Sequence, residues 1–327
     1  MRWGIAGPGA ISTRFTEAMR LVDGGSVVAV ASRSGERAAE FARRFDLERH
    51  YGSYEDLAGD ADVDIVYIGT PHSRHAADAL LYLEAGKHVL CEKPFTLNAA
   101  QAKQVVSAAR EQGRFVMEAM WTRFLPSYVA LSEALAEGRI GEPLLVEADF
   151  GWRSPVDPTN RHFDLAQGGG ALLDLGIYPV QLCFFVLGRP DGVVAYGHVG
   201  ETGVDEQVAA VLHHPGDRLG VVKTAIRTPL SCTARIAGTE GTIDLPAFMH
   251  CPEYIVVRTP SGEEQIDGRY EGDGLRFQVD EVHRCIAEGL LESPRMPLDE
   301  SIAIAETLDA IRAQIGVRYP GEDALKE

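Results

Sequence analysis

The chain has 327 residues, of which 45% are hydrophobic and 24% charged, and its formal net charge is −17. This length suits two domains, and the strongly negative charge argues against nucleic acid or an anionic membrane as a partner. We find no apolar run long enough to span a membrane and no signal peptide before the first predicted strand, so we expect a cytoplasmic protein. Five scattered cysteines without a CxxC pair predict free thiols, and no metal site is expected.

The chain begins with a strand, a glycine turn and a helix. Residues 2–6 are apolar, residues 7–12 read Gly-Pro-Gly-Ala-Ile-Ser, and residues 13–22 have the spacing of an amphipathic helix. Free N–H groups in such a turn and the positive helix end attract a pyrophosphate. Ser12 stands where this fingerprint usually has Gly or Ala, and a lone glycine turn is weak evidence. The candidate cofactor-binding residues here are Gly7, Gly9, Ala10 and Ile11.

The second predicted strand, residues 27–32, ends without the acidic residue that usually holds the ribose hydroxyls of NAD. Ser32 and Arg33 stand there instead, and Arg37 follows one helical turn later. A hydroxyl and guanidinium groups can bind a 2′-phosphate. These residues therefore predict NADP rather than NAD. The alternative is that both arginines are solvated surface charges.

Two further predicted strands end in polar residues. Residues 64–68 lead into Thr70-Pro71-His72, and residues 88–91 lead into Glu92-Lys93-Pro94. The carboxyl ends of the strands are the edge at which open α/β sheets bind ligands, so these residues should face the cofactor. Pro94 ends the ladder and fixes the turn. Lys93 is thus expected at the ligand crevice, whereas the alternative is an ordinary surface lysine.

The order of predicted elements changes near residue 120. Strands at 2–6, 27–32, 50–51, 64–68, 88–91 and 114–116 alternate with helices, which predicts a doubly wound parallel sheet of the Rossmann type. Strands then follow at 144–152, 192–199, 206–213, 220–226, 233–237, 242–245 and 254–258, with helices at 170–187, 276–288 and 300–315. The fold class is therefore α/β plus α+β, the second part being an open, mostly antiparallel sheet with helices on one face. We expect a dinucleotide-binding domain at 1–121 and a substrate-binding and oligomerisation domain at 122–327.

One glycine-rich segment joins a turn to two reactive side chains. Three glycines at 168–170 give the backbone room to turn beside a ligand, and Asp174 and Tyr178 follow four residues apart. On a helix this spacing puts a carboxylate and a phenol on one face. The alternative is a glycine loop before a buried helix, with Asp174 as a cap and Tyr178 in the core.

Several aromatic residues and one arginine suit a pocket for a sugar or a cyclic diol, since such a pocket combines an apolar rim with an occasional charge. Some of them can equally be core residues. The candidates are Trp121, Arg123, Phe150, Trp152 and Phe163.

These motifs, and their order along the chain, resemble those of the Gfo/Idh/MocA family of NAD(P)-dependent oxidoreductases. The resemblance rests on the N-terminal glycine turn, on Thr70-Pro71-His72, on Glu92-Lys93-Pro94 and on the glycine run before Asp174 and Tyr178. Within the family, the segments 118–124 (EAMWTRF) and 201–205 (ETGVD) are most similar to the dimeric dihydrodiol dehydrogenases and NADP-dependent D-xylose dehydrogenases. That group resembles this chain in having Tyr where many members have His.

The resemblance implies catalytic roles for Lys93, Asp174 and Tyr178, and a homodimer or a dimer of dimers. An open antiparallel sheet with helices on one side only also needs its other face covered, most simply by a second subunit. We therefore expect association through the C-terminal sheet.

Chemistry at such a crevice suggests a mechanism. Oxidation of a secondary alcohol needs a base, and a free tyrosine with a pKa of about 10 is too weak at neutral pH. A nearby Lys93 ammonium would favour the phenolate of Tyr178, while Asp174 would hold Lys93 or a second substrate hydroxyl. The expected substrate is an aldose such as D-xylose or a trans-dihydrodiol. The alternative is a non-catalytic NADP-binding redox sensor or structural protein on the same fold.

Overall fold

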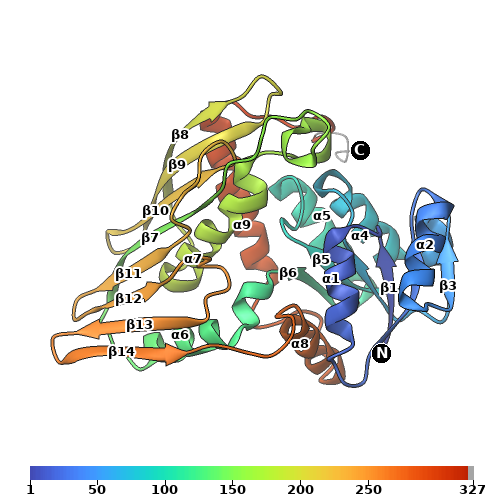
Figure 1. Cartoon of the computed structure of the whole chain (residues 1–327), viewed down its shortest axis with the longest axis horizontal. Helices are drawn as coiled ribbons and strands as arrows, with labels where there is room; N and C mark the ends of the chain where they lie inside the picture. Colours follow the sequence, from blue (N-terminus) through green and yellow to red (C-terminus); the bar gives the residue numbers. More distant parts are fainter. Residues whose placement is uncertain (323–327) are drawn as a thin grey trace. The chain divides into compact units, whose positions relative to one another are not determined.

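Residues 1–322 are described by a computed structural model, in which the chain divides into two compact units (Figure 1). Unit 1 comprises Met1–Phe124 and Glu271–Ile302, and unit 2 comprises Leu125–Tyr270 and the chain from Ala303 onward. Both units thus take their last elements from the C-terminal part of the chain. The end of the predicted second domain, residues 323–327, lies outside the described residues.

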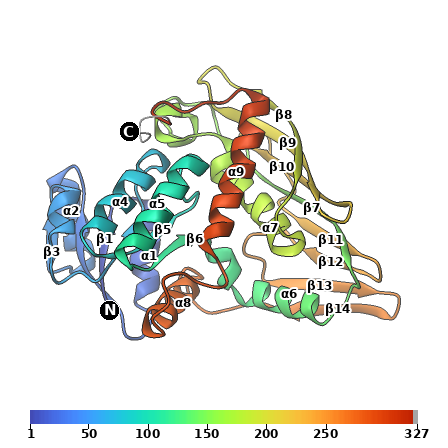
Figure 2. The same ribbon diagram turned by 180° about the vertical axis from the view of Figure 1, so that it is seen from behind.

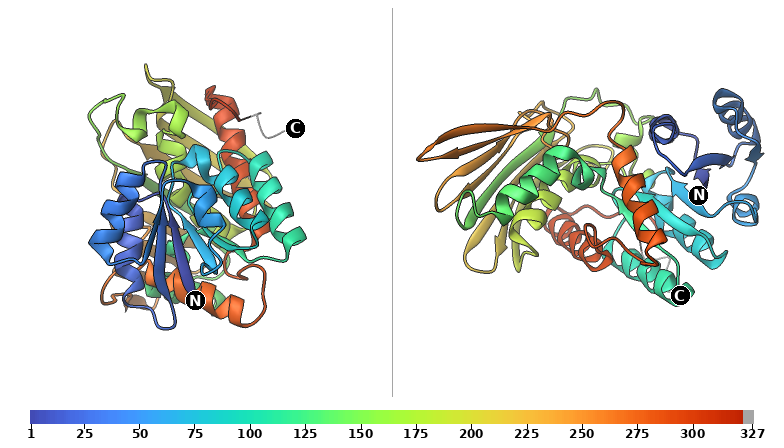
Figure 3. Two further views of the ribbon diagram at one scale, coloured as in Figure 1. Left: turned by 90° about the vertical axis from the view of Figure 1, so that its right-hand side faces the viewer. Right: turned by 90° about the horizontal axis from the view of Figure 1, so that it is seen from below.

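Unit 1 is built on a parallel six-stranded sheet in the order β3-β2-β1-β4-β5-β6. Helices cover both faces (Figure 3, left), and β4 (Ile65–Ile68) is accordingly apolar and buried along its whole length. The Rossmann-type prediction is confirmed. The other strands are β1 (Arg2–Ala6), β2 (Ser26–Ala31), β3 (Arg49–Tyr51), β5 (His88–Glu92) and β6 (Val116–Ala119). The helices are α1 (Ala10–Met19), α2 (Gly35–Phe45), α3 (Tyr54–Ala58), α4 (His75–Glu84), α5 (Ala99–Gln112) and α8 (Arg276–Ala287), with 3-10 turns η1 (His72–Arg74) and η2 (Trp121–Phe124).

The last strand of this sheet begins later than predicted. The sequence suggested a strand at 114–116, but β6 runs from Val116 to Ala119. Gly113 ends α5 with φ +59°, and the Arg114 N–H donates to Ala109 O, so both residues belong to the helix end. The strand itself includes a buried glutamate, Glu118, which hid it from an apolar pattern.

Unit 2 is built on an eight-stranded sheet in the order β14-β13-β12-β11-β7-β10-β9-β8. Its pairs are antiparallel except for β7 with β10, so the mostly antiparallel prediction is confirmed. The strands are β7 (Pro143–Gly151), β8 (Gly192–Val199), β9 (Asp205–His214), β10 (Arg218–Ala225), β11 (Ala234–Gly238), β12 (Thr242–Leu245), β13 (Tyr254–Thr259) and β14 (Gly262–Asp267). The edge strand β14 was not predicted, because its sequence GEEQID is polar and largely exposed.

The helices of unit 2 lie on one face of this sheet (Figure 3, right). Helix α7 (Ile177–Leu187) packs on β7 and β10, and α6 (Pro126–Ala136) packs on β13 and β14. Short helical turns η3 (Arg161–Phe163), η4 (Leu165–Gln167) and η5 (Leu172–Gly176) precede α7. Helix α9 (Leu298–Ile315) ends beside β8 (Figure 2), where the Gln314 side chain accepts from Ala195 N at 2.8 Å and donates to Val193 O at 3.0 Å.

The opposite face of the same sheet carries exposed apolar side chains. Burial alternates along β9, as expected of a strand with one buried face. Val194 of β8 is paired with Val211 of β9 and is 61% exposed, and Tyr196, two residues further along β8, is 82% exposed. Leu219 of β10 lies on the same face through its pairing with His213. Such a patch is typical of an interaction surface.

One helical stretch corrects an expectation about membranes. Residues Leu165–Leu187 are long and apolar enough to cross a bilayer by length and composition, contrary to the sequence analysis. However, 89% of the most apolar window is buried inside the protein. The stretch is therefore a core helix that packs on the sheet of unit 2.

Candidate active site

The predicted phosphate turn has the geometry that a dinucleotide needs. Gly7 has φ +87°, and its N–H donates to Ala31 O at 3.0 Å, which ties the turn to the second strand. Gly9 precedes helix α1, and no side chain of the described residues caps that helix end. The first backbone N–H groups of α1 can therefore donate hydrogen bonds to a bound anion. Ser12, which departs from the usual pattern, donates its hydroxyl to Gly7 O at 2.6 Å and braces the turn.

The residues predicted to choose between NADP and NAD lie at the end of β2. Ser32 is buried, and its hydroxyl accepts from Ser34 N at 3.2 Å, while Arg33 and Arg37 are exposed. Burial raises the pKa of the neighbouring Tyr54 phenol, whereas the charges of Arg74, Arg33 and Arg37 lower it. The Arg74 charge is paired with Asp78, whereas Arg33 and Arg37 are two exposed cations on this surface of unit 1. This arrangement fits an anionic group such as a 2′-phosphate.

A buried histidine ties together the loops that carry Thr70 and Pro94. The ring nitrogens of His75 lie 3.0 Å from Thr70 O and 2.8 Å from Pro94 O. Burial lowers the pKa of His75, although the two carbonyl groups oppose this. Thr70 also donates its hydroxyl to Asp78 at 2.7 Å. Thr70, the first of the predicted contacts Thr70, Pro71 and His72, is therefore held by a hydrogen-bond network.

The Glu92-Lys93-Pro94 segment is anchored by its buried glutamate. Glu92 accepts from the Tyr67 hydroxyl at 2.6 Å and from Lys93 N at 3.2 Å. Burial raises the pKa of Glu92, and the Lys93 charge opposes the shift. The half-buried Lys93 thus stands on a backbone fixed at the carboxyl end of β5, as the sequence predicted. Its catalytic role stays a prediction.

In unit 2, Asp174 and Tyr178 lie on a helix that begins with a π-turn. The sequence predicted one α-helix over residues 170–187, but Leu172–Gly176 form a π-helix and only Ile177–Leu187 are α-helical. Short π-segments are frequent at functional sites. Asp174 is 3% exposed and Tyr178 is 5% exposed.

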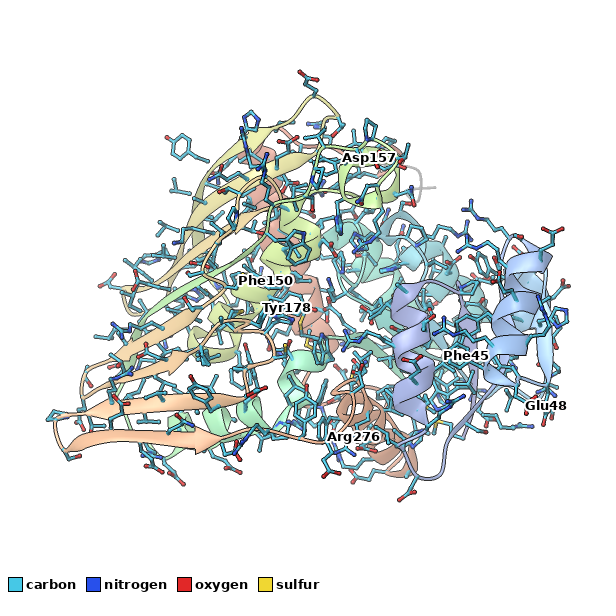
Figure 4. All side chains as sticks on the ribbon, viewed as in Figure 1. Phe45, Glu48, Phe150, Asp157, Tyr178 and Arg276 are labelled. Carbon is cyan, nitrogen blue, oxygen red and sulfur yellow. The ribbon has the colours of Figure 1, made fainter. Side chains whose placement is uncertain are left out.

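The Tyr178 ring belongs to an aromatic cluster. Its centroid lies 5.5 Å from that of Phe150 (Figure 4), with the rings almost perpendicular. The centroid of His250 lies 4.8 Å away. Phe150 contacts Trp152 in the same edge-to-face manner at 5.5 Å. These contacts fix the phenol in one orientation.

Two residues that sequence reasoning missed contact the Asp174 carboxylate. Arg161 donates to Asp174 Oδ2 at 3.0 Å, and His162 Nε2 lies 3.0 Å from the same oxygen, without the alignment of a hydrogen bond. The only sequence signal was a polar Asn-Arg-His segment shortly before the glycine run. Asp174 therefore forms an ion pair with a guanidinium.

Gly169 and Gly170 allow the polar segment that contains Arg161 and His162 to pack closely against the backbone before the helix. A Cβ on Gly169 would lie 2.6 Å from Arg161 O and 2.8 Å from His162 O, and Gly170 has φ +118°. Gly169 N donates to Asp164 O and Gly170 N to His162 O, each at 2.9 Å. Glycine is required here because two backbone segments approach closely.

The five predicted pocket residues are divided between the units. Phe150 and Trp152 belong to the Tyr178 cluster, and Phe163 is fully buried in unit 2. In unit 1, Arg14 lies 5.4 Å over the Trp121 ring, while buried Arg123 forms an ion pair with Glu300 and donates to Arg295 O. Contact of these residues with substrate stays a prediction. No group of three or more His, Cys, Asp or Glu within residues 1–322 is placed to hold a metal ion.

A buried aspartate of the neighbouring strand contacts the start of the π-turn. Asp205 Oδ2 accepts from Leu172 N at 2.6 Å, and the side chain is fully buried. Burial raises the pKa of Asp205 to about 7, although the hydrogen bond from Leu172 opposes the shift. The carboxyl group is thus held where ionisation is costly.

Comparison with known proteins gives matches over nearly the whole chain. Residues 1–120 match the family GFO_IDH_MocA, described as an oxidoreductase family with an NAD-binding Rossmann fold, and residues 128–244 match the GFO/IDH/MocA C-terminal domain. Trans-1,2-dihydrobenzene-1,2-diol dehydrogenase of Sus scrofa is 42% identical over 331 residues. The Homo sapiens enzyme of that name is 41% identical over 330 residues. Both alignments cover 98% of this chain and 98% of the relative.

Solved structures share the fold. A 3-ketoreductase from Actinomadura kijaniata in complex with NADP and TDP-benzene has a TM-score of 0.87 and 28% identity, covering 96% of this chain and 98% of that chain. Levoglucosan dehydrogenase in complex with NADH and levoglucosan also has a TM-score of 0.87, at 22% identity, covering 98% and 99% of the two chains.

The raised pKa of Asp205 predicts a pH dependence of stability. The folded state binds the Asp205 proton more tightly than the unfolded state, so this contribution is fully present below about pH 4 and is lost as pH rises through about 7. Asp205→Asn should therefore reduce the fall in unfolding free energy between pH 5 and 8 by roughly 2–3 kcal/mol. Urea titrations at several pH values measure this. The exposed control Asp46→Asn should leave the pH profile unchanged, and an unchanged profile for Asp205→Asn would contradict the assignment.

Proposed function

The chain belongs to the Gfo/Idh/MocA family of oxidoreductases, and we propose that it transfers a hydride between NADP and a secondary alcohol of a sugar or a cyclic diol. The observation that carries the proposal is the buried pair of Asp174 and Tyr178, held by an arginine and an aromatic cluster in unit 2. The relatives named as dihydrodiol dehydrogenases support a diol, and aldoses such as D-xylose offer the same arrangement of hydroxyl groups.

In this proposal NADP is held by unit 1 and the alcohol by unit 2. The uncapped end of α1 and the glycine turn fit a pyrophosphate, while Ser32, Arg33 and Arg37 fit the 2′-phosphate. The bound nicotinamide supplies the hydride acceptor. We assign cofactor binding to residues 1–121. We assign substrate binding and oligomerisation to residues 122–327.

Tyr178 acts as the general base in the oxidation direction and as the acid in reduction. Its phenolic oxygen takes the proton of the substrate hydroxyl, and the edge-to-face contact with Phe150 keeps the ring oriented for that transfer. A phenol needs a lowered pKa for this role, and the Lys93 ammonium is the proposed source of the positive charge. Asp174, whose charge is balanced by Arg161, accepts a hydrogen bond from a second substrate hydroxyl.

The outer face of the unit 2 sheet is the proposed site of self-association. Val194, Tyr196, Val211 and Leu219 share that face, and burying them against a second copy removes apolar area from water. We assign a homodimer, or a dimer of dimers, to this surface.

A substrate screen tests the proposed function. Purified protein with NADP and a panel of aldoses and cyclic vicinal diols should form NADPH, measured by its absorbance, with at least one member of the panel. A non-catalytic sensor would bind NADP yet form no NADPH with any member, and that result would overturn the proposal.

Tyr178→Phe removes only the hydroxyl that exchanges the proton. Turnover should fall by roughly 10²–10⁴-fold, while NADP affinity and the unfolding midpoint stay close to wild type. Lys93→Met should slow turnover and move the basic limb of the residual activity to higher pH, because the phenol loses the charge that lowers its pKa. Tyr128→Phe, which also removes a buried hydroxyl of unit 2, is the control and should retain turnover. Near-normal turnover of Tyr178→Phe would place the base elsewhere.

Arg33→Ala tests the cofactor assignment. Loss of a charge-assisted hydrogen bond to the 2′-phosphate should raise the KM for NADP by roughly 10–100-fold and leave the KM for NAD nearly unchanged. Arg43→Ala, an exposed arginine near the end of the same helix α2, should change neither value. Equal effects of Arg33→Ala on both cofactors would argue against NADP specificity.

Tyr196→Glu tests the self-association surface. A charge in the middle of the apolar face should convert the oligomer to monomers at micromolar concentration, as measured by light scattering. The control is Val156→Glu, because Val156 is an exposed apolar residue in a loop and is 62% exposed. A wild-type protein that is monomeric under these conditions would refute the assignment.

A further inference from the structure

One buried carboxyl group of the neighbouring strand β9 binds the start of the π-turn Leu172–Gly176, which contains Asp174 and precedes Tyr178. Asp205 is the first residue of β9, and its Oδ2 accepts from Leu172 N, the first residue of the π-turn, at 2.6 Å. Leu172 lies at a helix start, where backbone N–H groups have no partner within the helix. Asp205 thus does for this helix what a capping residue does, but from a different element.

The surroundings of Asp205 are shaped to admit its second oxygen. Asp205 Oδ1 is buried and has no hydrogen-bond partner among the described residues. A Cβ on Gly170 would lie 2.3 Å from that oxygen, so the glycine leaves the space that the carboxylate fills. Burial of this half-satisfied carboxyl group costs stability.

A tyrosine from the C-terminal part of unit 2 binds the backbone just before the π-turn, at Gly169. The Tyr319 hydroxyl donates to Gly169 O at 2.7 Å, and its ring lies under Arg312 at 4.9 Å. Two chain segments outside the π-turn therefore hold this backbone: the start of β9 binds Leu172 N, and Tyr319 binds Gly169 O. Between them the chain has little freedom to change the direction of Asp174 and Tyr178.

We propose that Asp205 is a positioning residue for the reaction: by holding Leu172 N it sets the π-turn that orients the Asp174 carboxylate and the Tyr178 phenol. The proposal rests on the proposed function for its kinetic consequence. Its structural consequence, a fixed Leu172 amide, can be measured without any activity.

The experiment compares Asp205→Ala, Asp205→Thr and Asp205→Asn with wild-type protein. Ala and Thr lack an acceptor at the distance of the carboxylate, whereas Asn keeps one. Threonine suits a strand, so it provides a second test where the alanine variant does not fold. The matched control is Asp149→Ala, because Asp149 is also buried and accepts a 2.6 Å hydrogen bond from a backbone N–H, that of Cys232, outside the turn.

The first readout is hydrogen–deuterium exchange of the peptide that contains Leu172–Tyr178, measured by mass spectrometry. Exchange should be at least tenfold faster in Asp205→Ala or Asp205→Thr, and close to wild type in Asp205→Asn and Asp149→Ala. Unchanged exchange in the Ala and Thr variants would overturn the positioning role.

The second readout is steady-state kinetics with NADP and an active substrate, well below the unfolding temperature. Asp205→Ala or Asp205→Thr should lower kcat by roughly 10–100-fold with little change in the KM for NADP, because a misplaced reacting group slows the chemical step. Asp205→Asn should restore kcat to within about threefold of wild type, and Asp149→Ala should leave it unchanged. A fall of similar size in Asp149→Ala would reduce Asp205 to a general stability role. If exchange is faster in Asp205→Ala and Asp205→Thr but the wild-type protein has no NADP-linked activity, the proposed function is refuted and the role of Asp205 in fixing the π-turn stands.

Discussion

The close approach of residues 161–164 to the glycine turn at 168–170 is the constraint on which the proposed reaction centre depends. No Cβ fits at Gly169, because the carbonyl oxygens of the crossing segment occupy its place. The backbone hydrogen bonds from Gly169 and Gly170 then fix that segment on the turn. As a result Arg161 and His162 lie against Asp174. A larger residue at Gly169 would separate the carboxylate from its cation.

Buried carboxyl groups recur at the ends of strands in both units. In unit 1, Glu118 at the end of β6 accepts from Phe95 N at 3.0 Å and from the Ser301 hydroxyl at 2.7 Å, and burial raises its pKa to about 7. In unit 2, Asp205 at the start of β9 has a pKa raised to about 7 for the same reason. Each group fixes a loop by accepting a backbone N–H. Such arrangements cost stability and cluster at functional sites, which fits an enzyme that orients its loops with buried carboxyl groups.

The sequence predicted the order of elements because hydrophobic periodicity and glycine turns are local signals. Strands such as residues 2–6 and 242–245 have the predicted bounds. The sequence prediction failed where tertiary contacts decide: β14 is a polar edge strand, and Leu172 N at the start of the π-turn donates to Asp205 of another strand. The candidate site was found where motifs are contiguous, as in the glycine run before Asp174. Arg161 and His162 carried no motif, and the segment that ends at Asp205 gave no sign of the contact with Leu172, because these contacts join chain segments that meet only in the folded protein.

The most direct measurement of the central claim follows the hydrogen that leaves the substrate carbon. A cyclic vicinal diol deuterated at its carbinol carbons is incubated with the protein and NADP, and the reduced cofactor is analysed by mass spectrometry and NMR. Hydride transfer predicts NADPH that carries one deuterium at C4 of the nicotinamide, together with a slower rate than for the unlabelled diol. Reduced cofactor without deuterium would contradict direct transfer between the alcohol and NADP.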